Sequence, residues 1–269
     1  MGTRSPLIWF GGKSKYAEYI ISRFPVHKKY VEPFGGAAHV IAQKPRITHE
    51  VYNDIDDNVV NFLMVNRKYP ERLAKACISI PYSRAIFERW KREQLPSDPF
   101  ERAVRWFYMN RSAISKGNAE EVPQTGWRHS TVSGQNPANG YITACNLLKS
   151  FSDRMSGVMI EKEDFRVIIP KYDDEKTLFY VDPPYVGREK YYAGGFSEED
   201  HRELAKLLKD VQGKVVLSYY EDPLIEELYS GWNREYFDAH RQVVGYETQD
   251  NSTEELLLMN FDNGQLTLF

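Results

Sequence analysis

Six short apolar runs recur along the chain, and each has the length of a β-strand. The runs are mostly apolar throughout instead of alternating with polar residues, which is typical of strands buried on both faces. The runs are 29–31, 50–52, 158–160, 178–181, 215–217 and 256–259. Helix-like stretches lie between them, at 16–24, 57–66 and from Ser197 onward. Because strands alternate with helices, the sequence predicts an α/β fold with a parallel sheet and right-handed crossovers.

Composition favours a soluble protein of a reducing compartment, the cytoplasm. The 269 residues contain 42% hydrophobic and 27% charged residues, enough for a sizeable core. Mean hydropathy is −0.56, and no apolar run is long enough to span a bilayer. Glycines interrupt the apolar stretch near the N-terminus, so it is not expected to be a secretory signal. Cys77 and Cys145 match no disulfide or metal spacing.

The net charge of −3 hides an uneven distribution. Residues 63–150 carry 14 Lys and Arg against 7 Asp and Glu, a charge of +7, whereas the remainder carries −10. A basic insert in an acidic body is expected where one part meets a polyanion and the other a small ligand. Solvated helix faces would give the same count, so charge alone leaves both interpretations open.

The basic segment also differs in its pattern. Residues 71–110 have helical spacing, and residues 112–139 are rich in Gly, Ser, Asn, Pro and Gln, as in loops and hairpins. We therefore expect a discontinuous α/β body, 1–62 and 151–269, interrupted by a mainly helical insert at 63–150.

A glycine turn follows the first apolar run. The residues Glu32-Pro33-Phe34-Gly35-Gly36-Ala37-Ala38 lead from that strand into a helix, and small residues there let the backbone approach a ligand. Asp54 lies at the tip of the next strand, where an acid binds ribose hydroxyls in nucleotide-binding sheets. The turn predicts a nucleoside-containing cofactor, although neither GxGxxG nor a phosphate-binding loop occurs.

The sharpest motif is Asp182-Pro183-Pro184-Tyr185, at the end of the run 178–181. Prolines fix the backbone and carry no N–H, so the acceptors of Asp182 and Pro183 can converge on an external donor. Tyr185 offers a face for a planar ring. This arrangement suits an exocyclic amine on an aromatic base, whose lone pair would be aimed at an electrophile. A proline-rich turn with a packed tyrosine is the structural alternative.

In the order of these motifs the sequence resembles the DNA adenine methylases, which transfer methyl from S-adenosylmethionine to the N6 amine of adenine. The resemblance implies a Rossmann-like S-adenosylmethionine-dependent methyltransferase sheet, with 63–150 as a target-recognition domain for double-stranded DNA. It implies catalytic roles for Asp182, Pro183, Pro184 and Tyr185, and cofactor contacts from Trp9, Lys13, Phe34, Gly36, Asp54, Asp164, Phe165 and Asp182. Residues 254–257 and Asn260 resemble the family's closing strand. No metal is expected.

Two departures from the family pattern stand out. The family's glycine turn reads FxGxG, and Ala38 stands at the last position here. Its methyl is tolerable if φ stays negative. The insert shares little beyond 107–111, so the recognised DNA site cannot be carried over.

DNA contacts within the insert are expected from basic and amide side chains, because Arg pairs with guanine edges and Gln with adenine. The candidates are Arg111, Lys116, Gln124, Arg128 and Gln135. Trp127 and His129 could enter the stack that a flipped base leaves, or Trp127 could belong to a hairpin core. RNA or cytosine N4 as substrate, and a catalytically inactive DNA-binding homologue, remain as alternatives.

Overall fold

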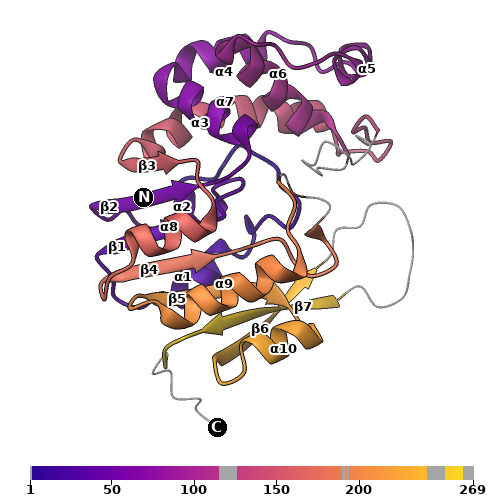
Figure 1. The fold of residues 1–269 in the computed structure, drawn as a ribbon. Helices are drawn as coiled ribbons and strands as arrows, with labels where there is room; N and C mark the ends of the chain where they lie inside the picture. Colours follow the sequence, from indigo (N-terminus) through magenta and orange to yellow (C-terminus); the bar gives the residue numbers. More distant parts are fainter. Residues whose placement is uncertain (1, 115–125, 190–191, 193, 241–251, 263–269) are drawn as a thin grey trace.

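The computed structural model describes residues 2–114, 126–189, 192, 194–240 and 252–262. Within this part of the chain seven strands form one sheet, in the order β3-β2-β1-β4-β5-β7-β6 (Figure 1). They are β1 (Lys29–Glu32), β2 (His49–Asn53), β3 (Val158–Glu161), β4 (Thr177–Val181), β5 (Lys214–Tyr220), β6 (Asn233–His240) and β7 (Ser252–Met259). Strands β3 to β5 in this order pair in parallel, and β7 pairs antiparallel with both β5 and β6. The mostly parallel α/β sheet is confirmed.

All six predicted apolar runs are strands, and two details differ from the prediction. β3 is only partly buried because it forms one edge of the described sheet. β6 was not predicted, because its sequence, Asn-Arg-Glu-Tyr-Phe-Asp-Ala-His, mixes charged and aromatic residues. It forms the opposite edge of the described sheet, and edge strands tolerate charged residues.

Side-chain alternation divides the sheet between two layers. Val31 and Val51 face a core formed with α8 (Phe165–Tyr172), α9 (Glu198–Asp210) and α10 (Pro223–Leu228). Their neighbours Tyr30 and Tyr52 face the opposite core, which contains residues of α1 (Ala17–Ser22) and α2 (His39–Gln43). Because successive strand residues point to opposite faces, mostly apolar runs can supply both layers.

The remaining helices gather beyond the β3 end of the sheet (Figure 1). They are α3 (Asp57–Lys68), α4 (Pro70–Ile78), α5 (Arg84–Arg92), α6 (Pro99–Ser112) and α7 (Pro137–Met155). Helices were predicted for 71–110, and α4, α5 and α6 confirm them. The expected domain boundaries fall inside α3 and α7, and these helices share one hydrophobic core with the sheet.

A buried ionic cluster ties α7 to the sheet. Arg154, in the last turn of α7, donates two hydrogen bonds to the Glu50 carboxylate of β2, at 2.8 and 2.9 Å. Lys44 donates a third, at 2.7 Å, and the side chains of all three residues are only 2% exposed. Removing one partner of such a buried network leaves an uncompensated charge, at a cost of about 3–5 kcal/mol. The cluster therefore fixes the helices against β2.

The glycine turn joins β1 to α2. Ala38, the residue before the helix, has φ 55 and is fully buried, so the condition stated for tolerating its methyl, a negative φ, is not met. A left-handed alanine costs roughly 1–2 kcal/mol. The surrounding contacts hold it there: Ala38 accepts a hydrogen bond from Ala42 N and donates one to Gly35 O.

Candidate active site

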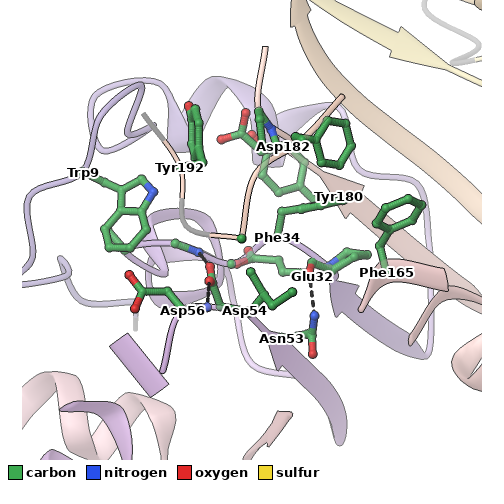
Figure 2. A pocket seen from close by; sticks show the side chains of 18 of the residues that line it. Trp9, Glu32, Phe34, Asn53, Asp54, Asp56, Phe165, Tyr180, Asp182 and Tyr192 are labelled. Carbon is green, nitrogen blue, oxygen red and sulfur yellow. Dashed lines mark hydrogen bonds between the residues drawn. The ribbon is translucent and has the colours of Figure 1, made fainter. Parts of the chain in front are cut away.

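One pocket lies at the carboxyl ends of β1, β2 and β4, the edge where parallel α/β sheets bind ligands (Figure 2). It brings together the glycine turn and the first residue of the Asp-Pro-Pro-Tyr motif. Predicted residues that line it are Trp9, Lys13, Phe34, Gly36, Asp54, Asp164, Phe165, Asp182 and Pro184. Pro183 and Tyr185 are buried beside it and do not line it.

Asp54 is held by the backbone of both neighbouring loops. Its carboxylate accepts hydrogen bonds from Gly36 N at 2.7 Å and from Asp56 N at 2.8 Å. Burial raises the pKa of Asp54 to about 7, although these two bonds oppose the shift. The side chain therefore shapes the glycine turn, and its remaining lone pairs are available to a ligand.

Two acidic side chains of this pocket were missed by the sequence analysis. Asp56 caps α3 through Oδ1, whereas its Oδ2 is buried and has no hydrogen-bond partner among the described residues. Glu32 accepts a hydrogen bond from the Tyr30 hydroxyl at 2.6 Å, and burial raises its pKa to about 8. Asp56 lies two positions after Asp54, and Glu32 lies two positions before Phe34. This closeness to predicted site residues is the sequence signal that could have identified them.

Aromatic rings form another part of the wall. Phe34 packs against Phe165 at 5.6 Å and against Phe196 at 5.9 Å between ring centroids. Asp164 precedes Phe165, accepts a hydrogen bond from Arg166 N and so begins α8. This aromatic group offers a planar, apolar surface next to carboxylates, which suits a nucleobase joined to a sugar.

Trp9 lies against the glycine turn. A Cβ on Gly36 would stand 2.8 Å from the indole Nε1 of Trp9, and Gly36 has φ +47. Glycine is therefore required twice at this position, by the left-handed backbone and by the close approach of the ring. Figure 2 shows Trp9 on one side of the pocket, across from the aromatic group around Phe165.

The Asp182 carboxylate lies just beyond the end of β4. Asp182 Oδ1 accepts hydrogen bonds from Lys13 Nζ at 2.9 Å and from the Tyr185 hydroxyl at 3.1 Å. Burial raises the pKa of Asp182, and the Lys13 charge opposes that shift. The side chain stays 21% exposed, so the carboxylate can meet a substrate.

The Tyr185 ring is more enclosed than expected. It is 4% exposed and packs against Tyr219 and Tyr220, with the Lys13 ammonium 4.9 Å from its centroid. In this conformation a cation covers the ring that was expected to face a base. Tyr192, from the segment after the motif, also lines the pocket.

The residues predicted to contact DNA differ in their surroundings in the structure. Arg111 donates to the carbonyls of Pro6 and Gly140, and burial lowers its pKa to about 10. Arg128 donates to Ala113 O at 3.2 Å. Neither arginine forms an ion pair with another described residue. Lys116 and Gln124 lie outside the described residues, and Gln135 is exposed.

Trp127 is buried in the hydrophobic core that the helices beyond β3 share with the sheet. It is 9% exposed, and its ring packs 4.3 Å from that of Tyr82 and 5.7 Å from that of Phe87. A backbone bridge to Ala113 holds it in place. Its position matches the hairpin-core interpretation, whereas His129 is exposed.

The part of the chain that the structure describes contains neither a membrane-spanning helix nor a metal-ligand cluster. No helix there is both long and apolar enough to cross a membrane. Nor do three or more His, Cys, Asp or Glu side chains come together there as a metal site.

Comparison with known proteins gives consistent relatives over nearly the whole chain. The chain is 24% identical to the Type II methyltransferase M.MjaIII of Methanocaldococcus jannaschii, over 95% of this chain and 98% of the relative. It is 25% identical to the Type II methyltransferase M1.LlaDCHI of Lactococcus lactis subsp. cremoris, over 95% and 94%. It is 21% identical to the DNA adenine methylase of Escherichia coli, over 95% of both chains.

The family model of the D12 class N6 adenine-specific DNA methyltransferases matches residues 9–244. That range contains the glycine turn, the helices beyond β3 and the Asp-Pro-Pro-Tyr motif. The chain therefore belongs to this family and is a site-specific DNA methyltransferase that acts on the N6 amine of adenine.

Proposed function

We propose that the pocket binds S-adenosylmethionine and that Asp182 presents the N6 amine of a DNA adenine to it. The observation that carries this proposal is the shared pocket: Asp182 and the glycine turn line one cavity. When bound, the cofactor supplies a methyl group on a positively charged sulfur. The protein then has to bind, orient and exclude water, which are the usual means of cofactor enzymes.

The pocket residues fit the chemical groups of this cofactor. The aromatic group of Phe34, Phe165 and Phe196 suits an adenine ring. Sugar hydroxyls need acceptors, and the carboxylates of Asp54 and Asp56 face the same pocket. The buried Oδ2 of Asp56 has no described partner, which is expected of an atom that awaits a ligand donor. Negative carboxylates also suit the cofactor's positive charges.

We assign the grip on the amine to Asp182 and the Pro183 carbonyl. Each would accept one N6 hydrogen, which turns the nitrogen lone pair toward the methyl group. An adenine within a duplex cannot reach a carboxylate at the end of a sheet, so the base must leave the stack, at a cost of a few kcal/mol. Pro184 and Tyr185 fix the loop that holds these acceptors, because proline φ is locked.

We assign DNA binding to the helices beyond β3, with 63–150 as the target-recognition part. Arg111 and Arg128 are candidate phosphate contacts, since they have no carboxylate partner among the described residues. Phosphate contacts position the duplex, and side chains in the grooves read its sequence.

Transfer of a labelled methyl group to duplex DNA tests the assignment of Asp182. We expect Asp182→Ala to lower the rate by at least about 10²–10³, the usual cost of losing a positioned polar group in the transition state. Cofactor affinity, measured by calorimetry, should change much less. Asp210→Ala, at the exposed end of α9, is the control. Equal rates for Asp182→Ala and the wild type would reject the assignment.

A further inference from the structure

Lys13 lies between two buried carboxylates. Its Nζ is 2.9 Å from Asp182 Oδ1 and 3.5 Å from Glu255 Oε1, and it also donates to Gly11 O at 2.8 Å. The Lys13 and Glu255 side chains are 3% and 4% exposed. The three charged residues come from the N-terminal segment, the end of β4 and strand β7. Only the fold brings them together.

One lysine cannot neutralise both acids. Burial raises the pKa of Glu255, with Lys13 opposing the shift and Asp182 adding to it. Glu255 Oε2 is buried and has no hydrogen-bond partner among the described residues. Glu255 forms the longer of the two ion pairs with Lys13, at 3.5 Å, so the pair offsets only part of the cost of burying this second carboxylate.

Substrate binding creates a conflict at Asp182. Lys13 and Tyr185 both donate to Asp182 Oδ1, so two donors already draw on the carboxylate charge that an N6 hydrogen would share. If Lys13 gives way, its ammonium remains in a site where it is 3% exposed, and an unpaired buried charge is expensive. The second carboxylate, Glu255, is within a small movement of Nζ.

We propose that Glu255 is a positioning residue for methyl transfer: it takes the Lys13 ammonium when Asp182 takes the target amine. This inference rests on the proposed role of Asp182. The Tyr185 ring, 4.9 Å from Nζ, provides a surface that attracts the cation while it changes partner. The exchange moves one hydrogen bond and leaves every proton on its own residue.

The inference makes Glu255→Gln informative. Glutamine keeps the shape of the side chain and one acceptor but removes the charge, so Lys13 stays on Asp182 and competes with the target amine. We expect kcat to fall about tenfold or more, the effect of 1.4 kcal/mol on a rate. KM for DNA, which depends mainly on phosphate contacts, and cofactor Kd should stay within about twofold. Glu255→Asp keeps the charge and should recover part of the rate.

The decisive experiment measures methyl transfer by wild type, Glu255→Gln and Glu255→Asp, with Glu235→Gln as matched control. Glu235 lies on the neighbouring strand β6 and pairs with Arg23 instead of Lys13. Thermal unfolding follows the fold of each variant. We expect Glu255→Gln to be as stable as the wild type or more stable, because burial disfavours its charge.

The variant Lys13→Gln tests whether Glu255 acts through Lys13. In that background Glu255→Gln should cost much less than it does beside Lys13, because the two residues act through one interaction. A wild-type kcat for Glu255→Gln, an equal loss in Glu235→Gln, or the same loss with Lys13 removed would each overturn the inference. An inactive wild type would instead overturn the proposed function.

Discussion

The Asp54 carboxylate accepts a hydrogen bond from Gly36 N at 2.7 Å, so the tip of β2 holds the turn that follows β1. The two residues are 18 positions apart in the chain. The family resemblance implies a role for Asp54 at the cofactor's ribose, and the structure shows that the same side chain shapes the glycine turn. Under the proposed function, one acid would therefore both shape the wall of the pocket and offer acceptors to its ligand.

Asp54→Ala should weaken cofactor binding and the fold together. It leaves the N–H groups of Gly36 and Asp56 without their acceptor, and hydrogen bonds to a charged group are worth about 1.5–3 kcal/mol each. We expect cofactor Kd to rise at least about tenfold by calorimetry. Asp57→Ala is the control, since Asp57 is 52% exposed and paired with Lys162 and Arg102. Unchanged affinity in Asp54→Ala would contradict the double role.

Cofactor affinity should depend on pH near neutrality. Burial raises the pKa of Asp54 to about 7, so the free protein protonates this group below that pH. Hydroxyl donors favour the ionised carboxylate, so binding releases the proton and affinity rises with pH through 7. Below pH 7 we expect Kd to rise by up to tenfold per pH unit.

The variant Asp54→Asn separates the pH dependence due to Asp54 from any pH dependence due to Glu32. Glu32 lines the same pocket and has a pKa of about 8, so its titration is centred higher. The asparagine variant should lose the step near pH 7 and keep any step near pH 8. An unaltered pH profile in Asp54→Asn would show that another group titrates.

The sequence predicted the sheet because each inner strand contains a short run that is mostly apolar and does not alternate. It also placed Asp182 and Asp54 correctly, since strand order and the carboxyl-end rule bring strand tips to one edge. The prediction that every apolar run is buried on both faces was wrong for β3, which is a partly buried edge strand. β6 was not predicted because edge strands tolerate charged residues.

Long-range relationships were harder to predict. Glu255 stands opposite Tyr220 because β7 returns antiparallel beside β5, a register that no local pattern encodes. The left-handed conformation of Ala38 was missed for the same reason: its surroundings, not its own preference, hold φ at 55. Asp56 caps α3 through Oδ1, and the position of its buried Oδ2, which has no described partner, could not be predicted from the sequence.

Gly36→Ala should weaken cofactor binding by moving Trp9. The new Cβ would meet Trp9 Nε1 at 2.8 Å, closer than real Cβ contacts allow, and it adds the cost of φ +47. We expect cofactor Kd to rise at least about tenfold and the indole fluorescence to change.

The matched control is Gly231→Ala. Gly231 also has a positive φ, +86, but a Cβ there would meet nothing within 4 Å. It therefore carries backbone strain without the collision, about 1–2 kcal/mol of stability. Equal losses of cofactor affinity in the two variants would show that strain, and not the position of Trp9, limits binding.

DNA binding should weaken steeply as the salt concentration rises. We expect α5 to contribute to the slope of log K against log salt. Arg84, Arg89 and Arg92 of this helix are exposed and make no ion pair with another described residue. Each phosphate contact contributes about 0.9 to the slope of log K against log salt. Replacing all three arginines with Gln should reduce the slope by up to about 2.7 if each contacts a phosphate.

Three lysines on the sheet side provide the control for this charge change. Lys176, Lys206 and Lys209 are exposed, and they lie before β4 and on α9, away from the helices beyond β3. Replacing them with Gln removes the same charge from the molecule, so the general effect of net charge is matched. If α5 contacts DNA, only the arginine variant changes the slope substantially, because counterion release follows direct contacts. Equal slopes in both variants would place the DNA on another surface.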